Sequence, residues 1–408
     1  MYDHRKLGRE LDIFGTDRLI GAGLPYWLPA GAAVRHALEE YVRELECSAG
    51  YQHVYSPVLG KRELYERSGH WEHYQDGMYP PMLLGSDPGS EHVVLRPSLC
   101  PHHAVIYRSR ARSYRELPLR LAELGGQYRS ELSGVLGGLT RVRAMQLNDA
   151  HIFCTPDQVA GEAGAALAMI RQAHRALGIE PSRYRLSLAS PDAHYAGDPQ
   201  IWDRSAAILR DVLASAGVDY EAEEGEAAFY GPKIDVQVAD SAEREASIAT
   251  IQVDFYQPQR FGLEYVGADG ARHRPVMVHR SVIGSIERQV AHLLDSHGGA
   301  FPPWLAPVQL IVLPITADQL PQAEALARQA IAHGIRAEIA SEGSLASRVR
   351  AHRLVPYQAV IGAAEAGADQ AALRLRDGRK LPAMTVAEGL ARITDMVRAY
   401  STELWHEP

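Results

Sequence analysis

Three residues that can bind a metal ion lie far apart in the sequence, each in an apolar stretch that we expect to be extended. They are Cys100 in RPSLCPHH, His151 in QLNDAHIF and His279 in PVMVHRSV. One thiolate and two imidazoles can hold a zinc ion and leave its fourth position open, as catalytic zinc sites do. Spacing alone does not single them out among 18 histidines, because most histidines have structural roles. The residues around them are therefore needed to distinguish a metal site from ordinary packing.

Strand alternation gathers charged and apolar side chains on the face that carries His151. Every second side chain of an extended strand points to the same side, so this face also holds Asp149, Leu147, Met145, Arg143 and Arg141. The upstream stretch 121–131 places Glu123, Arg129 and Glu131 at the same parity. A glycine-rich segment at 132–140 predicts an antiparallel hairpin between the two stretches. Its guanidiniums suit phosphate or carboxylate, although a solvated face with ordinary salt bridges is the alternative.

The stretch 276–288 supplies a second element directed at anions. A short apolar strand with His279 runs through Gly284 and Ser285 into a helix with apolar spacing. Arg288 follows about one turn later, and helix N-termini favour negative charge. We therefore expect the strand end, the helix start and Arg288 to converge on the same ligand.

Several motifs together resemble those of class II aminoacyl-tRNA synthetases, and most closely those of threonyl-tRNA synthetases. Arg129-Ser130-Glu131 with its hairpin resembles motif 2, and Gly284-Ser285-Ile286-Glu287-Arg288 resembles motif 3. Residues 54–57 (VYSP) after the helical pattern at 31–45 resemble motif 1, which in that family builds a twofold interface. Further matching stretches are DHRKLG at 3–8, SGHW at 68–71, LPLRLAE at 117–123, DAHIF at 149–153, FYGPKI at 229–234 and WLAP at 304–307.

The resemblance implies a role for each matching residue. Cys100, His151 and His279 would bind one Zn²⁺, whose open position takes the amino and hydroxyl groups of threonine, with Asp149 and Tyr230 as substrate contacts. Arg129 and Arg288 would hold the ATP phosphates and the reacting carboxylate, and Lys233 would lie nearby as a catalytic residue. The ATP site would also include Glu131, Arg141, Met145, Gln252 and Ser285, with Mg²⁺ accompanying ATP.

Some positions depart from the family pattern. Met145 replaces a phenylalanine that stacks on adenine, Leu147 and Asn148 replace a Gln-Asp pair, and Ile248 and Ala249 replace a cysteine and a glycine. A thioether can still cover a base, whereas Leu147 removes a polar contact. The phosphate-directed residues are thus retained while the pocket walls differ.

Composition and a Gly/Pro-rich break in the sequence predict two domains of mixed α/β (α+β) class. Residues 1–300 are expected to form an antiparallel-sheet catalytic domain, and a Gly/Pro-rich break at 298–304 leads to a small α/β anticodon-binding-like domain at 301–408. There we expect strands at 308–313, 337–340 and 358–361, a helix at 321–333, and anticodon contacts from Glu365 and Arg374. Equal numbers of acidic and basic residues from 308 onwards predict weak phosphate binding.

The remaining expectations concern the setting of the protein. No apolar run is long enough for a membrane span and no signal peptide is evident, so we expect a cytoplasmic protein. Three cysteines do not make a disulfide framework, and Cys47 and Cys154 are expected to be buried. The chain begins where the family's catalytic domain begins, which predicts that it has no editing domain. A homodimer is expected from motif 1.

Two functions remain open at this point. The first is activation of threonine, or of a close β-hydroxy amino acid, to the aminoacyl-adenylate and its transfer to tRNA in protein biosynthesis. The second is a paralogue that activates an amino acid for a non-tRNA acceptor, such as a carrier protein, or that serves as an inhibitor-resistant copy.

Overall fold

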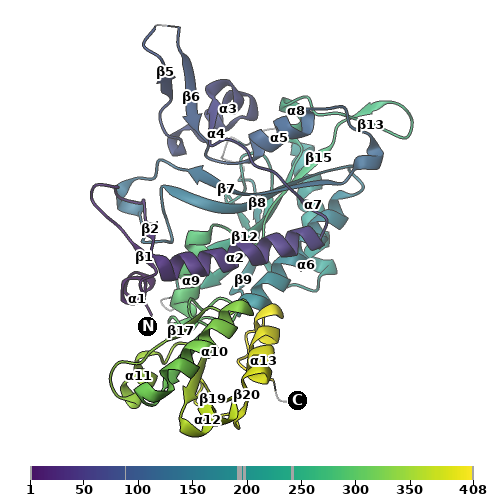
Figure 1. The fold of residues 1–408 in the computed structure, drawn as a ribbon. Coiled ribbons are helices and arrows are strands. Elements are labelled where there is room, and N and C mark those ends of the chain that lie inside the picture. The colour runs from purple at the N-terminus through teal and green to yellow at the C-terminus, as the bar shows by residue number, and fades with distance from the viewer. Residues whose placement is uncertain (1, 88, 191–194, 196–198, 240–242, 407–408) are drawn as a thin grey trace.

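The chain forms a large sheet-based unit and a smaller α/β unit, which lies below it in Figure 1. The computed structural model describes residues 2–87, 89–190, 195, 199–239 and 243–406. The large unit is built on an 8-stranded sheet. In spatial order its strands are β10 (Tyr220–Glu224), β9 (Arg183–Leu188), β11 (Lys233–Ala239), β12 (Glu245–Asp254), β15 (Val276–Ser281), β8 (Ala144–Cys154), β7 (Leu119–Tyr128) and β3 (Gln52–His53).

All inner pairings of this sheet are antiparallel, whereas the edge strands β10 and β3 run parallel to β9 and β7. The antiparallel catalytic sheet predicted from the sequence is therefore confirmed. The predicted hairpin also exists as β7 and β8, but the strands end at Tyr128 and Ala144. The connection consequently spans 129–143, longer than the predicted 132–140, and its arginines lie outside the strands.

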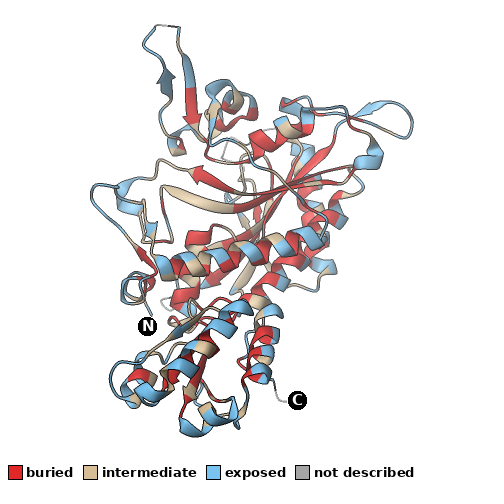
Figure 2. Cartoon of the chain, viewed as in Figure 1, coloured by how far each residue is buried: buried red, intermediate tan, exposed pale blue. Residues whose placement is uncertain are grey.

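Four helices cover one face of the sheet: α2 (Pro29–Ser48), α6 (Val159–Leu177), α7 (Pro199–Ser215) and α9 (Ile286–His297). Even-numbered residues of β8, including Ala150 and Ile152, enter the main core with them, and Figure 2 shows this buried layer in red. Odd-numbered Phe153 instead packs beneath α5 (Cys100–Arg108). Because alternation puts His151 on the odd face, the helices leave that face free for a site.

The helix boundaries follow from local capping. Ser285 begins α9, where its Oγ accepts a hydrogen bond from the amide of Arg288, and Gly298 ends the helix with φ of 59°. The helical pattern at 31–45 corresponds to α2. Cys154 is buried as expected, but the expectation for Cys47 is wrong: it lies exposed near the end of α2, on the helix face that points away from the core.

Short elements surround the large sheet. Near the N-terminus lie α1 (His4–Glu10), β1 (Phe14–Gly15) and β2 (Tyr26–Trp27). A projecting 3-stranded sheet of β4 (Leu59–Lys61), β6 (Glu91–Leu95) and β5 (Met82–Leu84) stands at the top of Figure 1. The others are α3 (Arg62–Ser68), α4 (His70–His73), α8 (Tyr256–Arg260), β13 (Tyr265–Val266), β14 (Arg272–His273), and the 3₁₀ turns Gln75–Gly77, Tyr114–Glu116, Ser133–Val135 and Ala317–Gln319.

The smaller unit has its own core and a 5-stranded sheet. The strand order is β17 (Ala337–Ile339), β16 (Leu310–Pro314), β18 (Tyr357–Ile361), β19 (Gln370–Leu375) and β20 (Met384–Thr385), with helices α10 (Leu320–Ala332), α11 (Leu345–Ala351), α12 (Ala363–Ala368) and α13 (Val386–Arg398). The predicted strands and helix there agree with β16, β17, β18 and α10. Phe301 and Trp304 in the predicted break pack into the large core. No helix in the described part of the chain is both long and apolar enough to cross a membrane.

Candidate active site

The three predicted metal ligands meet on the odd face of the sheet. His151 on β8 and His279 on β15 are direct cross-strand partners, with ring centroids 4.6 Å apart. Cys100 joins them from the other side, and one ligand atom of each residue lies within 4.8 Å of those of the other two. All three are buried. The expectation that Cys100 lies in a strand is wrong, because Pro101 follows it and suits the first turn of α5.

The hydrogen bonds around this cluster orient its side chains as they would be in a metal site. His151 Nδ1 lies 2.8 Å from His103 Nδ1, and His279 Nε2 lies 2.8 Å from Asp254 Oδ2. One nitrogen of each ligand ring is thereby fixed, which is how metal-binding histidines are oriented. His151 Nε2 is buried with no hydrogen-bond partner among the described residues, and its nearest carboxylate oxygen, on Asp149, is 3.9 Å away. A cation at this point would satisfy that nitrogen.

Cys100 also needs a nearby cation to act as a thiolate. Burial raises the pKa of its thiol to about 12, and the hydrogen bond from Ser98 Oγ at 3.3 Å only partly offsets that rise. A bound metal deprotonates a coordinating thiol. The Cys–His–His donor set is the type that zinc prefers and leaves a coordination position open.

Asp149 and Tyr230 adjoin the cluster, as the resemblance implied. Burial raises the pKa of the Asp149 carboxyl to about 6, although nearby positive groups oppose the rise. Tyr230 stacks on the His279 ring at 4.7 Å and donates a 2.6 Å hydrogen bond to Gln252 Oε1. These polar groups can recognise a small substrate with an amino and a hydroxyl group beside the metal-binding cluster.

A cavity of about 330 Å³ connects this cluster with a cationic region. Its lining includes most of the predicted site residues: Cys100, Arg129, Met145, Asp149, His151, Tyr230, Lys233, Gln252, His279, Ser285 and Arg288. The substituted residues Leu147 and Ile248 also line it. Glu131 and Arg141 do not: they pair with each other at 2.9 Å on the loop that follows β7. Their contact with ATP stays a prediction.

Two guanidiniums of this cavity lack negative partners among the described residues. Within the described part of the chain, neither Arg129 nor Arg288 forms an ion pair, and Arg129 Nε is buried without a hydrogen bond. Among the described residues, the Arg288 side chain donates to two carbonyl oxygens, from Nε to Thr140 at 3.1 Å and from Nη1 to Ser247 at 2.9 Å. Burial, and then repulsion by Arg129 and Arg141, lower its pKa. Such uncompensated charges favour an anionic ligand.

Comparisons with known proteins place this geometry in a family. A model described as the tRNA synthetase class II core domain (G, H, P, S and T) matches residues 84–297, and an anticodon binding domain model matches residues 309–396. A crystal structure of the RNA binding domain of threonyl-tRNA synthetase from Cryptosporidium parvum Iowa II has a TM-score of 0.90 and 34% identity, covering 97% of this chain and 98% of that one. The chain belongs to the threonyl-tRNA synthetase family.

Longer relatives in the threonyl-tRNA synthetase family agree. Threonine–tRNA ligase 1 of Bacillus subtilis (strain 168) is 46% identical across 89% of this chain, and threonine–tRNA ligase of Geobacillus kaustophilus (strain HTA426) is 43% identical across 98%. The chain spans only 57% and 62% of their lengths. Prolyl-tRNA synthetase of Giardia lamblia, solved with prolyl-adenylate, shares the fold with a TM-score of 0.73 at 16% identity, across 98% of this chain and 79% of that one.

Other residues of the site were not predicted from the sequence. Gln127 lines the cavity and lies 3.5 Å from Asp149 Oδ2, and Asp235 holds Lys233 Nζ at 2.7 Å. Alternation gave a usable signal for both, because Asp235 lies two residues from Lys233 on β11 and Gln127 lies two residues before Arg129, which was expected in the same strand. Asp254 had the same signal, because it lies two residues from Gln252 on β12, whereas His103 had none.

The predicted anticodon contacts lie in the smaller unit, far along the chain from the cavity. Glu365 Oε2 accepts a hydrogen bond from the Gly362 amide and so caps α12, while Arg374 is half-buried on β19 opposite Gln358. Their role in binding tRNA stays a prediction.

Proposed function

We propose that this chain activates threonine with ATP to form threonyl-adenylate and transfers the threonyl group to tRNA in protein biosynthesis. The observation that carries the proposal is the 330 Å³ cavity, which is lined both by the Cys–His–His cluster with Asp149 and by two guanidiniums that form no ion pair with a described residue. A threonine fits the cluster by its amino and hydroxyl groups. The phosphates of ATP fit the guanidiniums by charge.

Cys100, His151 and His279 would hold one zinc ion per chain. Zinc supplies an open Lewis-acidic position that accepts an amino and a hydroxyl group. Asp149 Oδ2 then accepts the hydrogen bond of the substrate hydroxyl, and Tyr230 contacts the amino group. An amino acid without a hydroxyl leaves these buried polar groups unpaired, which disfavours it far more than the loss of a methyl contact.

The reaction needs orientation and charge neutralisation more than covalent help from the protein. A carboxylate oxygen of the amino acid attacks the α-phosphorus of ATP, the bond to the bridging oxygen breaks, and pyrophosphate leaves with Mg²⁺. Arg129 and Arg288 hold the carboxylate and the phosphates and neutralise the charge that develops on phosphorus. Lys233, fixed by Asp235, adds a third positive group at the cavity wall. Met145 and Ser285 line the part where the adenine and ribose would lie.

The altered wall residues do not favour another acceptor. Leu147 and Ile248 make the cavity wall more apolar, but they leave the metal-binding cluster and both arginines in place. The matched relatives are threonine–tRNA ligases, and no observation favours a carrier protein. The cytoplasm, where free thiols such as Cys100 stay reduced, is the setting we propose.

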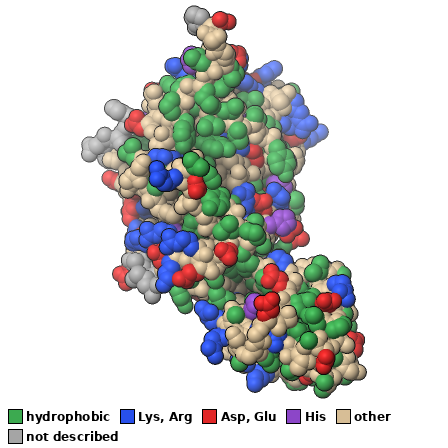
Figure 3. All heavy atoms as spheres, turned by 60° about the vertical axis from the view of Figure 1, so that its left-hand side comes forward, with side chains coloured by type: hydrophobic (Ala, Val, Ile, Leu, Met, Phe, Trp, Pro, Cys, Tyr) green, Lys and Arg blue, Asp and Glu red, His purple; other side chains and the backbone are tan. Residues whose placement is uncertain are grey.

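A homodimer completes the proposal. Large apolar side chains are exposed on the projecting sheet, including Leu83 at 58%, and on three connecting segments, with Tyr55 at 79%, Leu132 at 77% and Leu19 at 97%. Figure 3 shows apolar side chains gathered over much of the face that carries these elements. Contiguous apolar surface of this kind is typical of an interface, and motif 1 in α2 and the segment after it adjoins this face. Sedimentation of the purified chain as a 44.8 kDa monomer would contradict the dimer.

Aminoacylation with radioactive threonine tests the function directly. The purified chain should charge bulk tRNA in the presence of ATP, zinc and Mg²⁺, and Arg129→Ala should abolish the charging. Threonylation of a phosphopantetheinyl carrier protein without threonylation of tRNA would overturn the proposed acceptor.

A further inference from the structure

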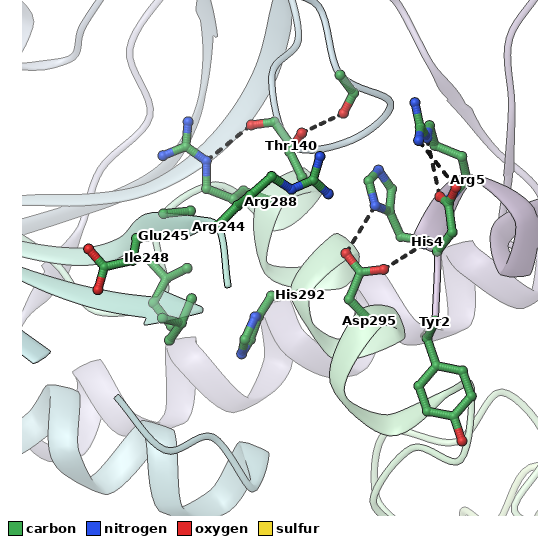
Figure 4. A pocket seen from close by; sticks show the side chains of 14 residues that line it. Tyr2, His4, Arg5, Thr140, Arg244, Glu245, Ile248, Arg288, His292 and Asp295 are labelled. Atoms are coloured by element: carbon green, nitrogen blue, oxygen red, sulfur yellow. Dashed lines mark hydrogen bonds and ion pairs between the residues drawn. The ribbon is translucent and has the colours of Figure 1, made fainter. Parts of the chain in front are cut away.

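Arg288 separates the candidate active site from a second cavity. This second cavity has a volume of about 530 Å³ and lies between the N-terminal segment, the 137–140 loop, α9 and the start of β12 (Figure 4). Arg288 and Ile248 line both cavities. Residues on the far side of Arg288 can therefore set the position of its guanidinium without touching a substrate.

His4 and Asp295 form a buried pair in the wall of that cavity. The His4 amide donates to Asp295 Oδ1 at 2.6 Å, and His4 Nδ1 lies 3.1 Å from Asp295 Oδ2. The side chains are only 7% and 8% exposed. Figure 4 shows the His4 ring facing Asp295 from the start of α1, which packs against α9. Both carboxylate oxygens are engaged by the same residue, so the His4 ring has a defined orientation.

The other ring nitrogen of His4 holds the loop that follows motif 2. The Leu139 amide donates to His4 Nε2 at 3.4 Å, so Nε2 is an acceptor and Nδ1 carries the hydrogen that goes to Asp295. Gly138 allows this approach: with φ of 58°, a Cβ there would lie 2.4 Å from His4 Nε2. Only glycine fits this backbone conformation at such close range.

The same loop accepts a hydrogen bond from the Arg288 side chain. Thr140 closes a turn onto Gly137 through its amide at 2.9 Å and its hydroxyl at 2.5 Å. Its carbonyl then accepts the 3.1 Å hydrogen bond from Arg288 Nε. Among the described residues the guanidinium has one further hydrogen-bond acceptor, Ser247 O. One of these two hydrogen bonds thus depends on a loop that His4 fixes at the preceding residue.

We propose that His4 and Asp295 are positioning residues for Arg288, acting through Leu139 and the Thr140 carbonyl. The inference rests on the proposed adenylation reaction, in which Arg288 meets charge on the phosphates. No carboxylate of the described residues pairs with Arg288, so its direction depends on these carbonyls. A misplacement of about 1 Å can cost roughly 100-fold in rate, so loosening this anchor lowers kcat while the fold persists.

Two substitutions of His4 separate its two hydrogen bonds. His4→Asn places an amide near Nδ1 and keeps the bond to Asp295 but removes the acceptor for Leu139. His4→Gln places a carbonyl near Nε2 and keeps that acceptor. In threonine-dependent ATP–pyrophosphate exchange, we expect His4→Asn to lower kcat by about 10- to 100-fold, with an unchanged KM for threonine. His4→Gln should retain most of the activity, and Lys6→Ala, an exposed change on the same helix, should match the wild type.

A double-variant cycle decides whether the effect passes through Arg288. In an Arg288→Lys background, where the bond from Nε is already lost, His4→Asn should lower kcat less than twofold further. Equal kcat for His4→Asn and wild type, or a full additional loss in the Arg288→Lys background, would overturn the inference. A wild-type enzyme without exchange activity would instead refute the proposed function. Thermal unfolding of each variant identifies any change that acts by unfolding the protein.

Discussion

A buried ion pair beneath the site gives a prediction that depends on charge alone. Glu46 on α2 is fully buried, and its Oε1 lies 2.7 Å from Arg280 Nη1, which is also fully buried. The same carboxylate accepts hydrogen bonds from Asn148 at 2.8 Å and His53 at 2.7 Å. Burial disfavours the ionised carboxylate, but Arg280 first and then these donors hold the pKa of Glu46 below its usual value. Arg280 follows His279 and Asn148 precedes Asp149, so the pair supports both site strands.

The change Glu46→Gln removes the charge and keeps the volume. It leaves Arg280 as an uncompensated buried cation, because the other contacts of its guanidinium among the described residues, the Tyr51 ring face at 4.1 Å and Asn148 Oδ1 at 3.5 Å, carry no negative charge. Removing one partner of a buried pair typically costs about 3–5 kcal/mol. At roughly 2 °C per kcal/mol for a unit of this size, the Tm should fall by about 6–10 °C. Differential scanning calorimetry measures this shift.

A matched control lies on the same helix. Glu40→Gln makes the same chemical change where the side chain is 62% exposed, and it should alter stability by less than about 0.5 kcal/mol. The double variant Glu46→Leu, Arg280→Met removes both charges and should recover part of the lost stability. A decrease in Tm of less than about 2 °C for Glu46→Gln would refute the reasoning, since the ion pair would then contribute little to the stability of the folded state.

Four further outcomes follow from the site. Wild-type protein should contain one zinc per chain by metal analysis, and Cys100→Ser should lose it; full occupancy in the variant would contradict the ligand assignment. Arg288→Ala should abolish pyrophosphate exchange with an unchanged Tm, and an unchanged rate would remove its role. Asp235→Asn should lower the pyrophosphate exchange rate several-fold, because it releases Lys233. Recovery of the exchange rate on adding salt would instead indicate that Asp235 acts through its charge alone and not by holding Lys233. Burial raises the pKa of the Glu287 carboxyl from 4.5 to about 7, so the folded state favours the protonated acid. At about 1.4 kcal/mol per pKa unit, the free energy of unfolding of the wild type should fall by about 3 kcal/mol as the pH rises through 4.5–7. Urea titrations at pH 5 and pH 8 should show this fall for the wild type and not for Glu287→Gln.

Strand alternation predicted much of the site because a strand fixes side-chain direction over several residues. Met145, Leu147, Asp149 and His151 all line the cavity, as their shared parity requires. The rule held for Arg129, directly after the end of β7 at Tyr128, but it failed for Glu131 and Arg141 in the irregular loop that follows. Arg141 was placed by the same parity, yet it pairs with a loop glutamate outside the cavity.

Contacts between distant segments could not be predicted from residue patterns. Cys100 matched the family motif, but the helix that it begins depends on packing against the odd face of the sheet. The support of the two histidines of the candidate metal site by His103 and Asp254 joins four different elements. Exposure of Cys47 depends on which side of α2 meets the core near its end, and a single small residue carries little information about that.

Amino-acid-dependent ATP–pyrophosphate exchange with threonine, serine and valine tests the central claim most directly. Serine keeps the amino and hydroxyl groups, so only the missing methyl distinguishes it, which is worth about 1–3 kcal/mol or roughly 10- to 200-fold in kcat/KM. Valine keeps the shape of threonine but lacks the hydroxyl, and so leaves Asp149 and the metal-binding cluster unsatisfied. We expect threonine to be activated best, serine measurably and valine far more weakly than serine. Valine activation equal to that of serine would contradict the claim that this cavity selects its substrate by the hydroxyl group.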